Sequence, residues 1–465
     1  MTDGARTGVN LEFARKYVGA RVLEQALGYL ARDPDRNLMR LLDLAERFAP
    51  LEEHRRQIRE LKVSFNRYPA YREYARRLFT EVNVRVRQKM AVNWFVNSAL
   101  LGIPKQRRLS EELGVNVPFF LLVDPTSACN LRCKGCWAGE YDKHDVMEPE
   151  LLDRIIREAK ELGIHWIVLS GGEPLCYPHL FDIVSKHDDV AFMFYTNGTL
   201  IDEAAADRIA ELGNISPAIS LEGGRERTDA RRGRGTFDKV MHAMDLLKER
   251  GALFGFSVTI TRENAEEVVS DEFLDLLIEK GCLYGWTFHY IPVGSDARPD
   301  LMVTPEQRAY LARRVPEIRR IKPLQFADFW NDGELTGGCI AGGRRYFHIT
   351  ARGDVEPCAF AHFAVDNIRD KSLKEVLQSP IFKAYQKRQP FSENLLRPCP
   401  IIDVPEALQE IVAESGARPT HPGAEAILSG ELAAAISRRA ETWARLSEPI
   451  WQERQRARQQ VSAGS

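Results

Sequence analysis

Apolar positions recur at two different spacings along this chain, and the change of spacing divides it. Between residues 10 and 113 they recur every three or four residues among many Arg and Glu, as in FARKYVGARVLEQALGYLARD. That period predicts amphipathic helices. From Val117 onward, short apolar runs alternate with helical patterns. We therefore expect a helical N-terminal region over residues 1–113, followed by an α/β region.

Short apolar runs in the α/β region predict about six strands. The runs are PFFLLV, HWIVLS, AFMFYTN, SPAISLEG, LFGFSVTIT and YGWTFHYIPVG. Helical patterns such as PELLDRIIREAKELG lie between them. Strands that alternate with helices indicate βαβ units and a parallel sheet. The alternation alone fits a full barrel, a partial barrel or an open doubly wound sheet.

The pattern changes again toward the C-terminus. Residues 304–321 look helical, and residues 335–402 are richer in Gly, Pro and Cys, with a hairpin-like stretch YFHITARGDVEPC. From about Pro405 the chain is helical and charged in pattern. These changes predict four parts: a helical region over 1–113, a core over 117–300, a linker helix with a small domain over 301–402, and a helical tail over 403–465.

The longest apolar run, MAVNWFVNSALLGI, covers Met90 to Ile103 and includes Asn93 and Asn97. Its 14 residues fall short of the roughly 20 that a membrane-spanning helix needs. Two interpretations remain open. The run is either a buried helix or a helix at a membrane interface near a lipid substrate.

Composition sets limits on function. The 465 residues are 44% apolar and 28% charged, which is typical of a soluble globular protein. A net charge of −2 gives no reason to expect nucleic acid as a partner, and it does not support peripheral membrane contact, which stays open. The N-terminus, MTDGARTGVN, lacks the apolar core of a signal peptide, so we expect a cytoplasmic location. Clustered thiols in that compartment point to metal or redox chemistry.

Three cysteines crowd into the stretch CNLRCKGC, directly after the first predicted strand: Cys129, Cys133 and Cys136. A structural zinc ion takes four protein ligands. Three thiolates instead suit a [4Fe–4S] cluster with one iron left open for a cofactor. A zinc site completed by Cys176 or a histidine is the alternative. The position at a strand's carboxyl end favours a functional site, because ligands bind at that face of α/β folds.

This C-x3-C-x2-C motif after a first strand resembles the signature of radical S-adenosylmethionine (radical SAM) enzymes. The resemblance covers roughly residues 117–300 and implies a partial (β/α)6 barrel. It also implies a site-differentiated [4Fe–4S] cluster that binds S-adenosylmethionine. In such enzymes the reduced cluster cleaves S-adenosylmethionine to methionine and a 5′-deoxyadenosyl radical, which abstracts hydrogen from the substrate.

The segment SGGEP follows the second predicted strand and matches the same family. A Gly-Gly pair lets the backbone approach a ligand closely. In the family this segment holds the amino group of the methionine moiety. The resemblance gives that role to three positions: Gly171, Gly172 and Glu173.

A further match lies at the end of the fourth predicted strand, where SLEG precedes TDARRGRGTF. The family commonly uses a polar residue here for ribose or carboxylate contacts, and an Arg shortly after it for the methionine carboxylate, which suits a bidentate guanidinium. The matching positions are Ser220, Glu222 and Arg232. The sequence does not separate Arg232 from its neighbour Arg231, and a solvated basic loop is the alternative.

Two weaker matches concern the ribose and the adenine. Thr259 or Asn264 at the fifth strand's end would reach the ribose, and residues 291–293 after the sixth would flank adenine, although both sets equally suit the core. The family often places an aromatic residue just before the third cysteine. Here Gly135 stands at that position and Trp137 follows the cysteine, so either the adenine contact differs or Trp137 supplies it.

Three more cysteines lie in the Gly- and Pro-rich region: Cys339, Cys358 and Cys399. The pattern Gly-Cys, hairpin, GDVEPC resembles the SPASM or twitch extension of radical SAM enzymes, and it implies a second, auxiliary [4Fe–4S] cluster. Three thiols leave one iron for the substrate or for a fourth ligand. That ligand would be His348, His362 or Asp403. Three unrelated buried thiols are the alternative.

The two remaining cysteines have no evident partners in the sequence. We expect Cys282 in the core. Cys176 follows SGGEP closely, and our hypothesis is that it lies within reach of the active site.

Together these features imply a radical SAM oxidoreductase of maturase type. The substrate class stays open among peptide, lipid and small molecule, and the expected electron donor is a low-potential protein such as flavodoxin or ferredoxin. The alternative from another class is a non-catalytic iron–sulfur electron carrier. SGGEP argues against it, because a carrier needs no cofactor-binding segment.

Overall fold

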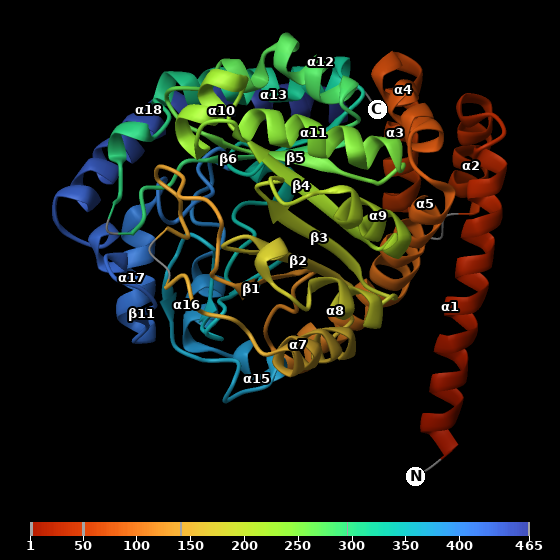
Figure 1. The fold of residues 1–465 in the computed structure, drawn as a ribbon, viewed down its shortest axis with the longest axis horizontal. Coiled ribbons are helices and arrows are strands. Elements are labelled where there is room, and N and C mark those ends of the chain that lie inside the picture. Colours follow the sequence, from red (N-terminus) through yellow and green to blue (C-terminus); the bar gives the residue numbers. More distant parts are fainter. Residues whose placement is uncertain (1–2, 49–51, 140–141, 295, 464–465) are drawn as a thin grey trace.

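Six parallel strands stand side by side in the order in which the chain forms them. The computed structural model describes residues 3–48, 52–139, 142–294 and 296–463 (Figure 1). The six strands are β1 (Leu121–Thr126), β2 (Trp166–Gly171), β3 (Ala191–Thr196), β4 (Ile215–Leu221), β5 (Gly255–Ile260) and β6 (Tyr284–His289). A doubly wound sheet reverses its strand order at a switch point. This sheet does not reverse, so the prediction of a partial barrel is confirmed.

Three further strands extend the sheet at its two edges. β7 (Gln325–Asp328) pairs with β6, whereas β8 (His348–Ile349) pairs with β1 and continues into β9 (Val355–Glu356). The order from β7 to β9 is linear, so the described residues do not form a closed barrel. β8 and β9 form the antiparallel hairpin that the sequence predicts, with His348 opposite Glu356.

β1 lies three residues later than the predicted strand PFFLLV. It begins at Leu121 and continues through Asp124 and Pro125, with a shift of register against β2 between Val123 and Thr126. A polar stretch can stay inside the sheet here because the Asp124 carboxylate accepts a hydrogen bond from Ser170 Oγ at 2.6 Å and pairs with His348.

Helices cover the outer face of the sheet. They are α7 (Pro149–Glu161), α8 (Leu180–Lys186), α9 (Glu203–Leu212), α10 (Arg225–Arg232), α11 (Thr236–Glu249), α12 (Asp271–Glu279) and α13 (Pro305–Ile321). Their apolar sides form one core with the strands, in which Ile155 and Ile156 of α7 and Phe192 of β3 are fully buried.

The N-terminal region is helical, as predicted, and covers the amino ends of the strands (Figure 1). Its helices are α1 (Asp3–Leu30), α2 (Pro34–Phe48), α3 (Glu52–Arg67), α4 (Pro69–Thr80), α5 (Val84–Ala91), the π-helix η1 (Val92–Gly102) and α6 (Ile103–Leu113). The buried Arg77 donates to the carbonyl oxygens of Ile278, Cys282 and Pro323, which precede β6 and β7. The carboxyl ends of the strands therefore stay clear of this region.

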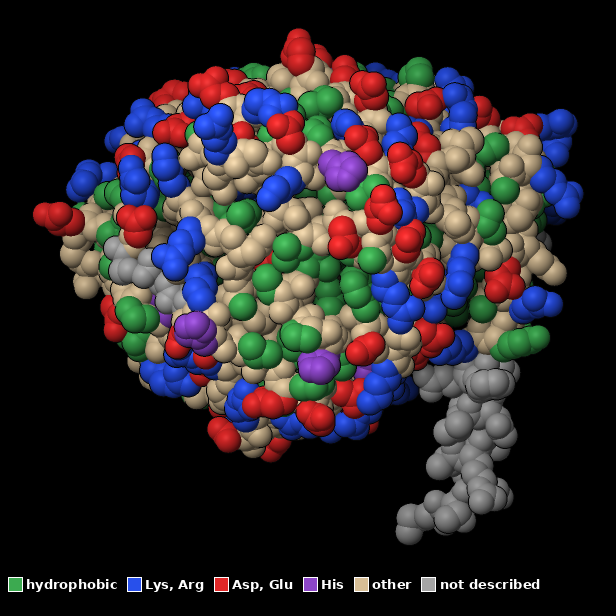
Figure 2. Space-filling model, viewed as in Figure 1, with side chains coloured by type: hydrophobic (Ala, Val, Ile, Leu, Met, Phe, Trp, Pro, Cys, Tyr) green, Lys and Arg blue, Asp and Glu red, His purple; other side chains and the backbone are tan. Residues whose placement is uncertain are grey.

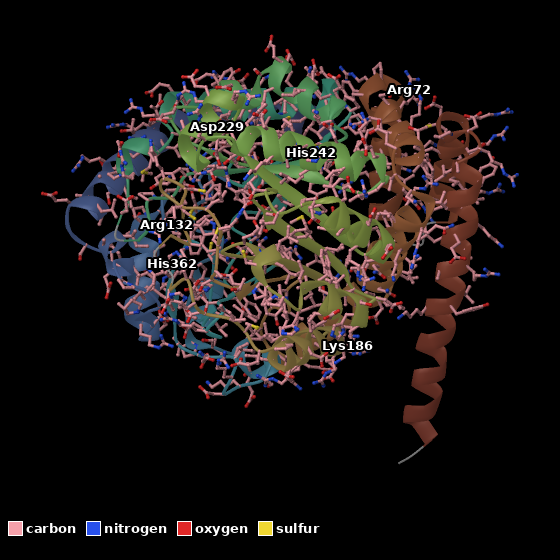
Figure 3. All side chains as sticks on the ribbon, in the orientation of Figure 1. Arg72, Arg132, Lys186, Asp229, His242 and His362 are labelled. Carbon is pink, nitrogen blue, oxygen red and sulfur yellow. The ribbon has the colours of Figure 1, made fainter. Side chains whose placement is uncertain are left out.

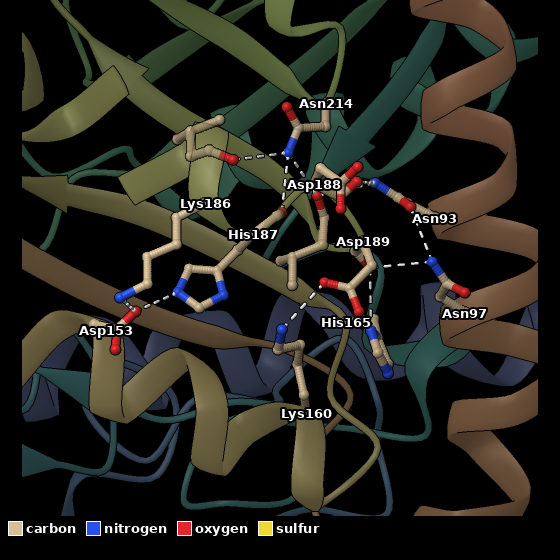
Figure 4. Close-up of polar contacts among 12 residues, drawn as sticks. Asn93, Asn97, Asp153, Lys160, His165, Lys186, His187, Asp188, Asp189 and Asn214 are labelled. Atoms are coloured by element: carbon tan, nitrogen blue, oxygen red, sulfur yellow. Dashed lines mark hydrogen bonds and ion pairs between the residues drawn. The ribbon is translucent and has the colours of Figure 1, made fainter. Parts of the chain in front are cut away.

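The apolar run from Met90 to Ile103 forms the π-helix and the turns beside it. Asn93 and Asn97 are buried, and they donate to the carbonyl oxygens of residues 188–190 in the loop before β3 (Figure 4). These bonds satisfy two amide NH2 groups that an apolar interface would leave unpaired. This side of the run is a buried helix, whereas Phe95 and Leu100 are exposed.

The C-terminal part wraps around the β1 edge of the sheet. Its elements are α14 (Gly333–Thr336), β10 (Phe363–Ala364), α15 (Leu373–Val376), α16 (Pro380–Arg388), α17 (Pro405–Ser415), β11 (Arg418–Pro419) and α18 (Gly430–Ala463). Short 3-10 turns complete the described chain: η2 (Pro174–Cys176), η3 (Glu267–Val269), η4 (Pro299–Leu301) and η5 (Ala424–Ile427). α18 lies against α13, so the tail is joined to the core.

Charged side chains of both signs are mixed over the face in Figure 2, and neither sign forms a broad patch there. This agrees with a net charge of −2. None of the helices in the described part of the chain is both long enough and apolar enough to span a bilayer.

Candidate functional site

A large cavity opens at the carboxyl ends of the parallel strands. It encloses about 1330 Å³ of empty space, with its open mouth included. The loop after β1 supplies three cysteines, β2 supplies a glycine pair, and β4 and β5 supply hydroxyl groups. The residues of these kinds that line it are Cys129, Cys133, Cys136, Gly171, Gly172, Ser220, Ser257 and Thr259. Four segments far apart in sequence thus meet at the edge where α/β folds bind ligands.

The three thiols after β1 surround one part of this cavity. Burial raises the pKa of Cys129 to about 11 and also raises that of Cys133, against which the Arg232 guanidinium acts in the opposite direction. The Leu131 N–H donates to Cys129 Sγ at 3.4 Å. Three soft thiol donors, one of them held by a backbone hydrogen bond, fit an iron–sulfur cluster. Among the described residues no group of three or more His, Cys, Asp or Glu side chains is placed to hold a single metal ion.

The glycine pair of SGGEP presses against the backbone that leads to the cysteines. A Cβ at Gly172 would overlap the carbonyl oxygens of Ser127 and Ala128, and one at Gly171 would overlap that of Thr126. Gly171 also has φ +107°. Both glycines line the cavity, and their lack of a side chain allows the close approach of the backbone that begins the cysteine loop.

Glu173 is fully buried and does not line the cavity. Its carboxylate accepts hydrogen bonds from Thr196 Oγ1 at 2.7 Å and from the Asn197 N–H at 2.7 Å. Burial raises the pKa of Glu173, and these bonds act against the rise. The side chain thus fastens SGGEP to the end of β3, and Gly171 and Gly172 are the residues of this segment that face the cavity together with Ser170.

Glu222 holds both arginines that the sequence left unresolved. Its Oε1 lies 2.6 Å from Arg231 Nη1 and 2.7 Å from Arg232 Nε. Arg231 also donates to the carbonyl oxygens of Lys134 and Gly135, which anchors the cysteine loop to α10. Arg231 and Arg232 line the cavity, whereas Glu222 lies behind them.

Some residues of the weaker sequence matches line the cavity, and one lies behind it. Ser220 and Thr259 line the cavity, and Ser220 Oγ lies 2.9 Å from Ser257 Oγ. Asn264 is buried behind the strand ends, where its amide donates to the carbonyl oxygens of Glu222 and Thr259. Ile291 lines the cavity.

Tyr290 occupies the space beside Gly135. A Cβ at Gly135 would lie 2.8 Å from the Tyr290 ring, and the glycine has φ +60°. Gly135, Tyr290 and Trp137 all line the cavity. The space beside Gly135 is therefore filled by an aromatic ring from the residue directly after β6.

Aromatic side chains form most of the remaining wall, and sequence reasoning missed them. They are Phe120, Trp166, Tyr195, Trp286, Phe288, Phe329, Tyr346 and Phe360. The signal was present in YGWTFH, where rings at Trp286 and Phe288 share one face of a strand. Trp94 of η1 packs on Trp166 with 4.6 Å between ring centroids, which closes the floor of the cavity.

The second group of cysteines lies beside this aromatic wall. Burial raises the pKa of all three thiols, that of Cys339 to about 12. Tyr385 is fully buried, and after burial itself the charges of Cys358, Cys339 and Cys399 are the causes that raise its pKa. Cys339 and Cys358 pack in one apolar cluster, and Cys399 is buried on a third segment. That these three thiols hold one auxiliary cluster stays a prediction.

The three proposed fourth ligands all have other partners. His348 lies between Asp124 and Glu356. Asp403 forms a buried ion pair with Arg308 and accepts a hydrogen bond from the Cys399 N–H at 3.0 Å. His362 packs on His421 with 3.9 Å between ring centroids and faces Trp137 of the cysteine loop, on the side of the molecule that also carries Arg132 (Figure 3).

The last two cysteines do not line the cavity. Cys282 is fully buried, with its sulfur 4.0 Å from Met244 Sδ, so the prediction that it belongs to the core is confirmed. Cys176 lies in η2 and is absent from the cavity lining.

Two family models match the chain at the positions of the two cysteine groups. The model of the radical SAM superfamily matches residues 123–274. A model described as an iron–sulfur cluster-binding domain, SPASM, matches residues 339–400.

Curated relatives are similar over the same part of the chain. The mycofactocin maturase of Mycobacterium tuberculosis is 31% identical over 310 residues, which cover 62% of this chain and 77% of that protein. The PqqA peptide cyclase of Granulibacter bethesdensis is 27% identical over 296 residues, which cover 58% of this chain and 77% of that protein. These relatives are enzymes by name, and they give no support to the electron-carrier alternative.

Solved structures share the fold at lower identity. SuiB of Streptococcus suis bound to S-adenosylmethionine aligns with a TM-score of 0.53 at 19% identity, covering 64% of this chain and 75% of that chain. SuiB bound to the precursor peptide SuiA aligns with a TM-score of 0.54 at 17% identity, covering 64% and 74%. At these identities the similarity concerns the fold.

Proposed function

The chain belongs to the radical SAM superfamily, and from that premise we propose that it is a maturase-type enzyme that modifies a side chain of a peptide. Its cofactors are S-adenosylmethionine, a [4Fe–4S] cluster that binds it, and an auxiliary cluster. The observation that carries the proposal is one cavity that joins three thiols to an aromatic wall. The names of the maturase and peptide cyclase relatives support a peptide as the substrate class.

Six cysteines would hold the two clusters. Cys129, Cys133 and Cys136 would hold the cluster that binds S-adenosylmethionine, and Cys339, Cys358 and Cys399 the auxiliary one. When bound, the first cluster and S-adenosylmethionine supply a radical that abstracts hydrogen from an unactivated carbon. The chain's own part is to place these groups and to keep water from them.

Contacts to S-adenosylmethionine would come from residues that line the cavity near the first thiols. Arg232 is the proposed partner of the methionine carboxylate, because its guanidinium is largely buried and lines the cavity. The backbone of Gly171 and Gly172 would meet the amino group, and Ser220 the ribose. Glu173 and Glu222 would act through the segments that they fasten.

We propose that the side chain of the substrate that reacts binds against the aromatic wall. Rings such as Trp286 and Phe288 bury apolar surface and offer few hydrogen bonds to water. A peptide side chain or other apolar group is therefore bound with little competing solvent. A low-potential donor such as flavodoxin or ferredoxin is our proposed source of electrons for the site cluster.

The test measures 5′-deoxyadenosine. The enzyme is reconstituted anaerobically, reduced with dithionite and given S-adenosylmethionine with a fraction of short peptides from the organism that encodes it. We expect the peptide fraction to stimulate 5′-deoxyadenosine formation, and the same fraction digested with a non-specific protease to lose that effect. Stimulation that survives digestion, or that a lipid extract produces instead, would reject the peptide assignment while leaving the enzyme class intact.

A further inference from the structure

Tyr346 lies between the aromatic cavity and the auxiliary thiols. Its hydroxyl oxygen is 3.1 Å from Cys358 Sγ. Its ring lines the cavity together with Ala359 and Phe360. The same ring stacks on Phe120 with 5.1 Å between centroids and 1° between planes. One side chain thus touches both the substrate space and a sulfur of the second cysteine group.

The position of this ring is held from two directions. Phe120 packs on Trp166 as well as on Tyr346, and Phe329 meets Tyr346 edge-on with 6.4 Å between centroids. The backbone N–H of Tyr346 donates to the Ile340 carbonyl oxygen at 3.2 Å, which ties the residue to the turn after Cys339. A ring packed in this way has little rotational freedom, so its hydroxyl stays directed at the sulfur.

The direction of the hydrogen bond follows from the chemistry of the two groups. A cysteine that ligates iron is a thiolate and only accepts. The phenol O–H therefore donates to the sulfur.

We propose that Tyr346 is the direct contact between the substrate cavity and the auxiliary cluster, and that its hydrogen bond to the Cys358 sulfur raises the reduction potential of that cluster. Hydrogen bonds to ligand sulfurs tune iron–sulfur potentials because they stabilise the more negative, reduced state. Tyr346 is a positioning residue, because it acts through Cys358. The inference rests on Cys339, Cys358 and Cys399 holding the auxiliary cluster, and it is independent of the substrate class.

The test is a redox titration of the loaded enzyme, followed by electron paramagnetic resonance. The variants are Tyr346→Phe, which deletes the donor and keeps the ring, and Tyr385→Phe as the matched control. Tyr385 is a second buried phenol near the same three thiols, and its hydroxyl has no hydrogen-bond partner among the described residues. A parallel titration in a background lacking Cys129, Cys133 and Cys136 assigns each signal to its cluster.

We expect Tyr346→Phe to lower the reduced-to-oxidised ratio of the auxiliary cluster roughly tenfold at the wild-type midpoint, which corresponds to about 59 mV for one electron. Tyr385→Phe should change that ratio less than twofold, and the site cluster should not move in either variant. An unchanged midpoint in Tyr346→Phe, or an equal shift in Tyr385→Phe, would overturn the proposal.

A second measurement tests the proposal even if Tyr346→Phe fails to hold the auxiliary cluster. In the wild-type enzyme exchanged into D2O, pulsed resonance should detect a strongly coupled exchangeable deuteron at the auxiliary cluster, and Tyr385→Phe should retain it. Absence of such a deuteron in the wild type would also overturn the proposal. Iron content reports separately on whether the three cysteines hold a cluster.

Discussion

His348 Nε2 lies 2.9 Å from Asp124 Oδ2, and this ion pair joins the C-terminal hairpin to the first strand of the sheet. On its other side, His348 Nδ1 lies 2.7 Å from Glu356 Oε2. Asp124 in turn accepts a hydrogen bond from Ser170 of SGGEP. A buried imidazolium between two carboxylates therefore connects the S-adenosylmethionine segment with the auxiliary-cluster region.

Replacing His348 with Gln should destabilise the protein strongly. The neutral amide leaves Asp124 buried without its cation and removes one of the two histidines beside Glu356, and breaking a buried pair costs about 3–5 kcal/mol. The midpoint of denaturant unfolding under anaerobic conditions measures this. Arg352→Gln is the control, because its pair with Asp145 is half exposed and is worth about 0–1 kcal/mol. Equal shifts for the two variants would contradict a stabilising role for the buried pair.

The stability that His348 supplies should vanish in alkaline solution. Burial works against the charged ring, but Asp124 and Glu356 outweigh it and raise the pKa of His348 from 6.5 to about 10. A raised pKa adds stability below the unfolded value, which is lost as pH rises through the folded one. The difference in melting temperature between wild type and His348→Gln should therefore be full at pH 6 and shrink between about pH 6.5 and 10. A difference that grows over this range would contradict the assignment.

Local sequence patterns predicted the alternation of strands with helices and the residues directly after the strands, whereas the partial barrel was implied by the family resemblance. The cysteine loop, Gly171, Gly172 and Ser220 meet because parallel strands bring their carboxyl ends to one edge. Contacts between segments distant in the sequence could not be predicted from these local patterns. The alternation of Trp286 and Phe288 was readable, but nothing local shows that Tyr346 faces the same space.

The sequence alone did not reveal which residues hold the carboxylates of the two site motifs. A carboxylate in a motif suggests ligand contact. The Glu173 carboxylate, however, accepts hydrogen bonds from Thr196 and Asn197, and the Glu222 carboxylate pairs with two arginines. Hydrogen-bond partners decide whether a carboxylate faces a ligand, and those partners come from other strands.

Gly172→Ala should remove the site cluster and spare the auxiliary one. The added Cβ would overlap the carbonyl oxygens of Ser127 and Ala128, which are rigid backbone, so the cysteine loop must move. Anaerobic reconstitution should then give about four iron atoms per chain in place of about eight. Iron and sulfide analysis with electron paramagnetic resonance measures this.

Gly28→Ala is the matched control for that experiment, since a Cβ at Gly28 meets nothing within 4 Å. It should load both clusters fully. Full loading and normal S-adenosylmethionine cleavage by Gly172→Ala would show that the loop tolerates the displacement.

Tyr290→Leu should weaken the binding of S-adenosylmethionine. Tyr290 fills the space beside Gly135 and lines the cavity at the third cysteine, where the ring can stack on adenine. Stacking of a base on an aromatic ring is worth about 1–3 kcal/mol, so we expect the dissociation constant to rise about tenfold or more. Isothermal titration of the reconstituted enzyme under anaerobic conditions measures it. Tyr290→Phe keeps the ring and loses only the hydroxyl, which accepts from the Arg298 N–H at 3.1 Å, so it should bind nearly as the wild type does. If Leu and Phe weaken binding equally, the hydroxyl and the loop that it holds matter more than the ring, and Trp137 becomes the candidate for the adenine contact.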